Sequence, residues 1–396
     1  MLLTLARDKL DVKNKNRSNV FNWRGQFTPQ FIEYLLEQFS SAETILDPFC
    51  GSGTVLREGA LLDKSVYGFE INPAAYTMSK FHSFSNFTQE KRCEIFDGLS
   101  NSLEDFVIPY ANMPLFISSS DHRTKYKNLL ECGHALLSQT KDKNQKLLAL
   151  LMLFYAEDSP NGSISATLSK AANNLKKNIS ALPYTKSKIH AELRDARLSH
   201  EGLAAKVDLI ITSPPYINVF NYHQNYRAIL EILGFDMLKV ASSEIGSNRQ
   251  NRGNRFKTVV QYCLDMSLSI KSLADCIKPA GHLIMVMGRE SKVRGISFYN
   301  ALIVKELISD TKCFNTIGTF ERVFINRFGE NIYEDIIVVQ KRNVPPAVVD
   351  AKCIAIKHLK NGLSKAVADV KEDLSAAIEA APSVAPSPLF NRKDII

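Results

Sequence analysis

The feature that most constrains this chain is a strand, a glycine turn, a helix and a second strand within residues 44–70. Residues 44–46 form a short apolar run that stops at a turn over residues 47–54, which contains two glycines. Residues 55–61 then repeat apolar side chains at helical spacing, and the second strand pattern ends at Glu70. This order is typical of a βαβ unit with parallel strands. It predicts a fold built around a mostly parallel sheet.

Four segments differ in their patterns along the chain. Residues 1–84 hold the βαβ unit, and residues 186–343 return to alternating strands and helices, so both are expected to build one α/β domain. Residues 85–185 have helical patterns and few strands, which predicts a helical insertion with a small core of its own. Residues 344–396 contain apolar positions at intervals of three or four and then a Pro-rich end, which predicts one amphipathic helix and a loose tail.

Composition excludes several classes of protein. No apolar run approaches the roughly 18 residues of a membrane span, and the first residues do not resemble a secretory signal, so a cytoplasmic chain without a membrane partner is expected. Seven cysteines without CxxC spacing argue against a disulfide framework or a zinc site, and no metal is expected. Isolated histidines, including His82 and His223, lack ligand spacing and are expected to pack or lie on the surface. The net charge of +8 fits a polyanionic partner but does not identify one.

The glycine turn has the composition of a ligand-binding turn. Gly51 and Gly53 let the backbone bend sharply and approach a ligand, and the following helix presents unpaired N–H groups. Glu70 ends the next strand, where a carboxylate can hold the hydroxyls of a ribose. Leu56 stands where the dinucleotide fingerprint needs its third glycine. These residues indicate a nucleoside-containing cofactor, with a plain strand-to-helix connection as the alternative.

A second element, Ser-Pro-Pro-Tyr, follows the apolar strand pattern of residues 207–212. Its two prolines fix the backbone and remove N–H donors, so that nearby carbonyl acceptors face outward. Acceptors can draw the hydrogens of an exocyclic amine away from its lone pair, and the Ser213 hydroxyl can accept or donate. Tyr216 offers a flat face on which a base could stack, worth about 1–3 kcal/mol. A simple turn at the end of a strand is the alternative.

Together, Asp-Pro-Phe-Cys-Gly-Ser-Gly-Thr at residues 47–54 and Ser-Pro-Pro-Tyr at residues 213–216 resemble two motifs of the S-adenosylmethionine-dependent DNA amino-methyltransferases. These enzymes methylate N4 of cytosine or N6 of adenine. The resemblance covers about residues 20–84 and 186–342. It implies a Rossmann-like α/β fold with a mostly parallel twisted sheet of the class I methyltransferase type, a helical insertion and a C-terminal helix.

The resemblance also implies a set of cofactor-binding residues for S-adenosyl-L-methionine. The turn would surround the methionine part, Glu70 would hold the ribose, and Asp195 would lie near the adenine amine, with Asp97 as the competing assignment. A looser match at residues 23–29 would place Thr28 beside the methionine part, although Thr28 and Pro29 also suit an ordinary helix start. The turn residues with this expected role are Asp47, Pro48, Phe49, Gly51, Gly53 and Thr54.

The expected chemistry is a direct displacement that needs no metal. The amine nitrogen attacks the methyl carbon and the sulfonium leaves as a thioether, while the catalytic residues position the base; these are Ser213, Pro214, Pro215 and Tyr216. The target base must first leave the duplex. Serine at the head of the motif favours cytosine N4 over adenine N6. C5-cytosine methylation is disfavoured because no cysteine follows a proline here.

The implied function is a site-specific methyltransferase acting on double-stranded DNA with its target base flipped out. It would belong to a restriction–modification system, with the cognate restriction endonuclease as a functional rather than a physical partner. The alternatives are N6-adenine methylation, an RNA amine target, or a catalytically silent module that binds nucleic acid.

Two segments are candidates for target recognition. The insertion at residues 85–185 does not directly precede Ser213 as a recognition domain usually does, so a lid or stabilising role is the alternative. The loop at residues 249–257 carries four basic residues and no acid, and is expected to contact DNA phosphates unless it is merely solvated. Its basic residues are Arg249, Arg252, Arg255 and Lys257.

Overall fold

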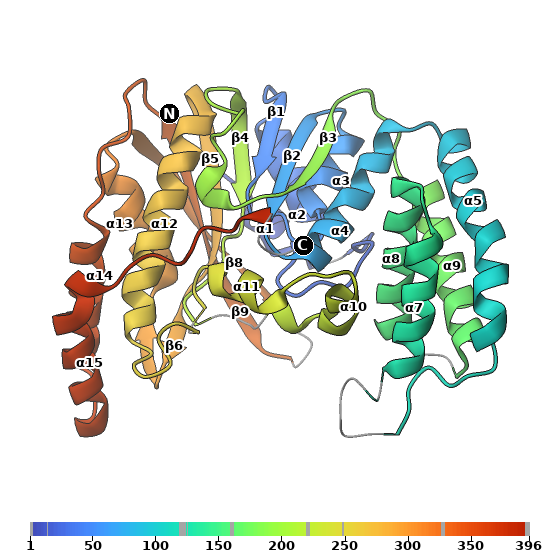
Figure 1. Ribbon diagram of the computed structural model, residues 1–396. Coiled ribbons are helices and arrows are strands. Elements are labelled where there is room, and N and C mark those ends of the chain that lie inside the picture. The colour runs from blue at the N-terminus through green and yellow to red at the C-terminus, as the bar shows by residue number, and fades with distance from the viewer. Residues whose placement is uncertain are drawn as a thin grey trace.

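A computed structural model describes residues 3–13, 15–118, 124, 126–158, 162–218, 222–247, 249–325 and 329–392 (Figure 1). Its main feature is a seven-stranded sheet in the order β3-β2-β1-β4-β5-β9-β8. The first five strands are mutually parallel, β9 is antiparallel to β5, and β8 is antiparallel to β9. The strands are β1 Thr44–Asp47, β2 Ser65–Glu70, β3 Ile189–Leu193, β4 Val207–Thr212, β5 Ile277–Gly288, β8 Phe314–Ile325 and β9 Asn331–Lys341.

This strand order confirms the predicted class I methyltransferase type of Rossmann-like sheet. The chain starts at the centre with β1, moves outward to β3, and then returns to the other side of β1 with β4. The order therefore reverses between β1 and β4. Ligands of open α/β sheets bind beyond the carboxyl ends of the strands at such a reversal.

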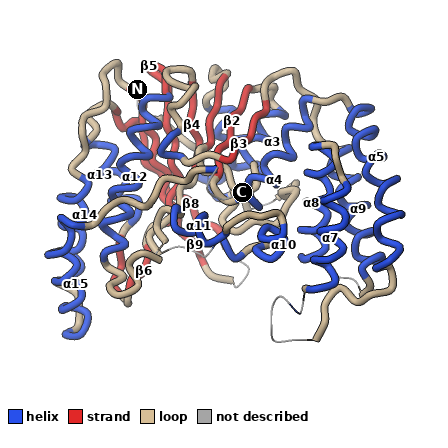
Figure 2. The backbone as a smooth tube through the Cα atoms, in the orientation of Figure 1, coloured by secondary structure: helices blue, strands red, loops and turns tan. Residues whose placement is uncertain are grey.

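Helices cover both faces of the sheet, as Figure 2 shows by the red strands between blue helices. Alternate strand residues point to opposite faces: Ile45 packs with α2 and α3, whereas Leu46 packs with α12 and α13. Burial on both faces explains the continuous apolar strand patterns. The covering helices include α2 Pro29–Gln38, α3 Thr54–Leu61, α4 Pro73–Phe81, α12 Lys257–Cys276 and α13 Asn300–Asp310.

The helical insertion is present, at the right of Figure 1. Its helices are α5 Gln89–Val107, α7 Lys127–Gln139, α8 Lys143–Asp158 and α9 Ile164–Ser180. The expectation of a separate core is wrong, because the buried cluster of the insertion continues into α4 and α10 (Arg227–Ile232). The nearly all-apolar α8 packs on α9 and also on α4, so its second face is covered by the α/β domain.

The C-terminal part differs from its prediction in two ways. Instead of one helix there are two, α14 Ala351–Leu363 and α15 Ala368–Ala380, because Val367 takes an extended conformation between them. An apolar spacing of three or four residues continues through this break, so periodicity alone cannot reveal it. The segment after α15 is packed rather than loose: it passes α12 toward β3, and Ser387 and Phe390 are both buried.

Neither a membrane span nor a metal cluster is found where the structure is described. In those residues no helix is long and apolar enough to cross a membrane. Over the same residues, no three histidine, cysteine, aspartate or glutamate side chains are grouped so that they could hold a metal ion.

Candidate active site

The glycine turn and the Ser-Pro-Pro-Tyr loop open on the same edge of the sheet. β1 and β4 are parallel neighbours, with Ile45 paired to Leu209, so both loops leave the carboxyl ends of adjacent strands. The Thr212 hydroxyl donates a hydrogen bond of 2.7 Å to Asp47 Oδ1, and these two residues directly precede the two loops. The convergence that the sequence predicts for the two motifs is therefore present.

The glycine turn is held tightly against α4. Gly51 and Gly53 have φ angles of +50° and +88°, which side chains other than glycine rarely adopt. A Cβ at Gly53 would lie 2.9 Å from the Ser79 Cα. Behind the turn, His82 Nε2 is 3.0 Å from the Ser52 carbonyl, and burial lowers the pKa of His82 to about 3. His82 is therefore neutral and donates to this carbonyl, which fixes the turn.

Gly53→Ala should lower the free energy of unfolding by more than Gly202→Ala does. Both glycines have positive φ angles, +88° and +76°, but a Cβ at Gly202 meets nothing within 4 Å. Backbone strain of about 1–3 kcal/mol is thus common to both variants, and only Gly53→Ala adds a clash with α4. Urea unfolding of both variants measures the difference, and equal losses would show that the contact with α4 contributes nothing.

Glu70 lies beside the turn with part of its carboxylate open. Its oxygens accept from the backbone N–H groups of Gly51 at 3.1 Å and of Ile71 and Asn72 at 2.9 Å each. A carboxylate has about four acceptor positions, so one remains, on Oε2. Burial outweighs these hydrogen bonds and raises the pKa of Glu70 to about 7. Burial likewise raises the pKa of Asp47 to about 7.

The segment upstream of α2, which contains the looser motif match at residues 23–29, contacts the turn. The Ser52 hydroxyl donates to Gln26 Oε1 at 2.7 Å, and the Trp23 ring lies next to Gly51. Trp23 also stacks on Tyr222, with ring centroids 5.8 Å apart and planes 17° apart. Thr28 directly precedes α2 and its side chain makes no capping hydrogen bond.

Asp195 lies where the sequence predicts, at the carboxyl end of β3 beside Glu70, but its carboxylate is fully occupied. The N–H of Arg194 donates to the Glu70 carbonyl at 3.0 Å. Asp195 Oδ1 accepts from the N and Nε of Arg197, and Oδ2 accepts from Arg197 Nη2 and from the N–H of Phe390. All four acceptor positions are therefore used by the chain itself. A contact from Asp195 to an adenine amine stays a prediction and requires Phe390 to move away.

The competing assignment, Asp97, is far from the strand ends. It lies within α5, is exposed, and pairs with Lys176 at 3.6 Å. Position at the sheet edge thus favours Asp195 over Asp97.

The Ser-Pro-Pro-Tyr loop packs its tyrosine against the end of β5. A Cβ at Gly288 would lie 2.6 Å from the Tyr216 ring, so glycine is needed there. Tyr216 Oη is 3.3 Å from Ser213 Oγ and donates to Glu334 Oε1 at 3.5 Å. Burial raises the pKa of Tyr216 and of Glu334. Neither Gly288 nor Glu334 carried a sequence signal for this contact, because Gly288 reaches Tyr216 through the pairing of β5 with β4 and Glu334 through the pairing of β9 with β5.

The basic loop lies at this same edge. Because β4 and β5 are parallel, α12 runs back across the sheet, and the loop before it lies at the carboxyl ends of the strands. Arg252 and Arg255 are exposed, Lys257 begins α12, and Arg249 is half-buried. The loop therefore lies near the Ser-Pro-Pro-Tyr loop, as predicted, and its contact with DNA stays a prediction.

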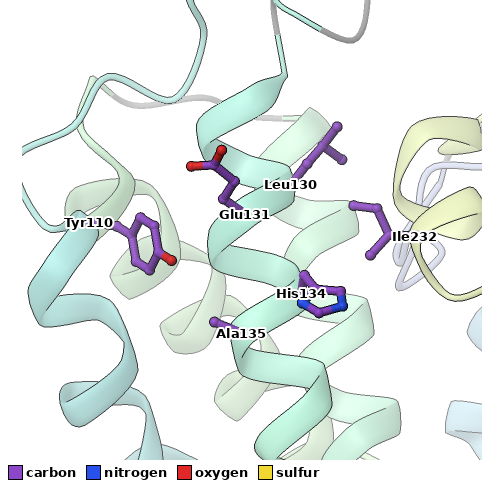
Figure 3. Close-up of a pocket in the computed structure, with 6 residues that line it drawn as sticks. All are labelled: Tyr110, Leu130, Glu131, His134, Ala135 and Ile232. Carbon is purple, nitrogen blue, oxygen red and sulfur yellow. The ribbon is translucent and has the colours of Figure 1, made fainter.

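A cavity of about 480 Å³ lies elsewhere, between α7 and α10 (Figure 3). No residue of the glycine turn or of the Ser-Pro-Pro-Tyr loop lines it. Its lining residues are Tyr110, Leu130, Glu131, His134, Ala135 and Ile232.

Comparisons with known proteins show which family this chain is similar to. Residues 35–248 match the family described as the RMKL-like methyltransferase domain. Type II methyltransferase M.BsoBI of Geobacillus stearothermophilus is 24% identical over 288 residues, which are 57% of this chain and 55% of that protein. Type II methyltransferase M.MjaII of Methanocaldococcus jannaschii is 35% identical over 72 residues, which are 17% of this chain and 14% of that protein. The chain thus spans about half of the first relative and a small part of the second.

One similar solved structure is described as SAM-dependent methyltransferases from Methanosarcina mazei. The match includes 76% of this chain and 92% of that chain, with a sequence identity of 13% and a TM-score of 0.33.

The family match covers more than half of the sequence, including the glycine turn and the Ser-Pro-Pro-Tyr loop. The chain belongs to the family of RMKL-like methyltransferase domains. Family and fold imply S-adenosylmethionine as the cofactor. The described residues fit it, since Glu70 keeps an acceptor position beside a glycine turn at a helix N-terminus.

Proposed function

We propose that this chain is an S-adenosylmethionine-dependent DNA methyltransferase that modifies the exocyclic N4 amine of cytosine in duplex DNA. The hydrogen bond from Thr212 to Asp47 carries the proposal, because it holds a cofactor turn and an amine-accepting loop side by side. The similarity to two proteins named type II methyltransferases supports DNA as the substrate. The same similarity supports a restriction–modification role, with a cognate restriction endonuclease as the functional partner.

The cofactor would lie across the carboxyl ends of β1, β2 and β3. The turn residues 47–54 would surround its methionine part, with Thr28 close by, and Glu70 would accept a hydrogen bond from one ribose hydroxyl at its open position. The bound cofactor supplies an electrophilic methyl carbon on a sulfonium. Asp195 would border the adenine, which follows from its place next to Glu70.

The residues of the second loop would bind and orient the target base. Ser213 and the carbonyls beside Pro214 and Pro215 would accept hydrogens from the amine, which directs the nitrogen lone pair toward the methyl carbon. The amine nitrogen would take the methyl group that the cofactor supplies, the cofactor sulfur would keep the electron pair of the broken bond, and the amine would release one proton. Tyr216 stays protonated at neutral pH, so its role is to stack and position rather than to remove a proton. Positioning supplies most of the acceleration.

Transfer of a labelled methyl group to duplex DNA, RNA and protein, followed by nucleoside analysis, tests the proposal. Label on N4-methylcytosine from duplex DNA is the expected result. Label on N6-methyladenine would overturn the choice of base, and label on RNA alone would overturn the substrate class. If a preparation with a cooperative unfolding transition, and hence folded, binds cofactor or nucleic acid but transfers no methyl group, the chain is a catalytically silent binding module.

A further inference from the structure

A buried histidine links a buried carboxylate to the basic loop. His223 lies in the short turn η4 Tyr222–Gln224 with 1% of its surface exposed. Its Nδ1 is 3.0 Å from Glu244 Oε2, and its Nε2 is 2.9 Å from Arg249 Nη2. Glu244 is also buried. The three side chains thus form one chain of hydrogen bonds from the interior to Arg249.

The contact with arginine fixes the proton on the histidine. A guanidinium has only donors, so the Nε2 atom that faces Arg249 must present its lone pair. Gln224 Nε2 lies 3.0 Å from the same nitrogen and can donate to it as well. The proton of the neutral imidazole is therefore on Nδ1, where it donates to Glu244. With both ring nitrogens engaged, the histidine offers Arg249 an acceptor of fixed direction.

The chain of hydrogen bonds is joined to the Ser-Pro-Pro-Tyr loop. The N–H of Asn218 donates to the Gly246 carbonyl at 3.1 Å. A Cβ at Gly246 would collide with the Tyr216 carbonyl, so the backbone two residues after Glu244 touches the loop directly. Arg249 follows Gly246 by three residues. Glu244, which holds His223, therefore lies two residues from backbone that contacts Tyr216.

We infer that Glu244 and His223 are positioning residues that hold Arg249 ready to bind a DNA phosphate at this edge; the inference rests on the proposed function. His223 engages Nη2, and the remaining donors of the guanidinium fork are suited to phosphate oxygens. A held side chain loses less freedom on binding than a free one does. Arg252 gives the contrast: it is exposed, and in the described residues no hydrogen bond or ion pair is found for it.

The test is the salt dependence of binding of the full chain to a random-sequence DNA duplex of fixed length. Each phosphate contact contributes about 0.9 to the slope of log K against log salt concentration, so Arg249→Ala should reduce the slope by about 0.9. His223→Asn keeps a donor for Glu244 but removes the acceptor for Arg249, which keeps its charge but loses its fixed position, so the slope should fall by part of this amount. His223→Gln can place an amide oxygen near the Nε2 position and should keep most of the wild-type slope.

Double variants separate positioning from general damage. His223→Asn should add nothing to Arg249→Ala, but should add fully to Arg252→Ala, which removes from the same loop a charge that no described residue holds. Thermal unfolding and binding of S-adenosylhomocysteine show whether each variant is folded. If His223→Asn does not fold, His223→Phe replaces it, because phenylalanine retains a ring but has neither nitrogen.

Equal slopes for His223→Asn and His223→Gln, or full additivity with Arg249→Ala, would overturn the inference. Salt-independent DNA binding by the wild-type chain would instead count against the proposed function itself. If Arg249→Ala changes the slope and His223→Asn does not, Arg249 contacts DNA but His223 and Glu244 do not position it, and the inference is wrong.

Discussion

Tyr216→Ala is expected to lower the rate of methyl transfer about 10³-fold. Lost stacking on the target base costs about 1–3 kcal/mol, and misplacement of the base lowers the rate by a further factor of about 10². The ring fills the space left by Gly288, so its removal also frees the Ser213 loop at the reacting edge. The proposed cofactor site lies across the carboxyl ends of β1, β2 and β3 and keeps its own hydrogen bonds. Single-turnover kinetics, with calorimetric titration of the cofactor, should show the rate falling while cofactor affinity changes little.

Two variants serve as controls for this result. Tyr216→Phe keeps the ring and loses only the bonds to Ser213 and Glu334, so a loss of about tenfold or less is expected. Ser213→Ala removes the hydroxyl acceptor and is expected to cost about 10²-fold to 10³-fold, as the loss of one preorganised hydrogen-bonding group does at other active sites. Wild-type turnover in Tyr216→Ala would remove this residue from the proposed chemistry.

Asp47→Asn is expected to change how stability depends on pH. The pKa of Asp47 rises to about 7 in the folded chain because burial disfavours the charged form. A raised pKa stabilises the fold fully below the ordinary pKa near 4, and this contribution is lost as pH rises toward 7, since only the unfolded chain ionises there. At 1.36 kcal/mol per pKa unit, the loss is up to about 4 kcal/mol. Urea unfolding of the cofactor-free protein between pH 4 and pH 8 measures it.

The asparagine variant suits this test because Thr212 and Phe49 both donate to the same oxygen, Oδ1, which the amide can supply. It removes the titration and keeps the two hydrogen bonds. Relative to the variant, the wild-type chain should lose stability between pH 4 and pH 7 and remain level above that range. Parallel pH curves for the two proteins would show that Asp47 ionises as easily in the folded chain as in water.

The sequence predicts the sheet and the meeting of the two loops because their signals are local. Apolar runs that end in a turn mark the carboxyl ends of strands, and parallel strands bring these ends to one edge. The two motifs lie more than 150 residues apart, yet each stands at the end of its own strand, Asp47 as the last residue of β1 and Ser213 directly after β4. Knowledge of the strand order is then enough to place them together.

The rest of the site depends on contacts between distant segments that no local pattern records. Glu334 reaches Tyr216 only through the antiparallel pairing of β9 with β5. His223 looks like an isolated histidine in the sequence, and its partners at positions 244 and 249 follow no ligand spacing. The backbone N–H of Phe390, nearly 200 residues further along the chain, donates a hydrogen bond to Asp195. The sequence therefore predicts where this carboxylate lies but does not show that its acceptor positions are already used.

The anchoring of residues 387–390 has a consequence for how the protein is made. Arg197 donates to the carbonyls of Ser387 and Pro388, and Asp265 accepts from the N–H and hydroxyl of Ser387. During translation, β3 and α12 leave the ribosome long before these partners exist. Until then Arg197 lacks two of its carbonyl acceptors and keeps only Asp195 and Asp265, so the packing beside β3 becomes complete only when synthesis has passed Phe390.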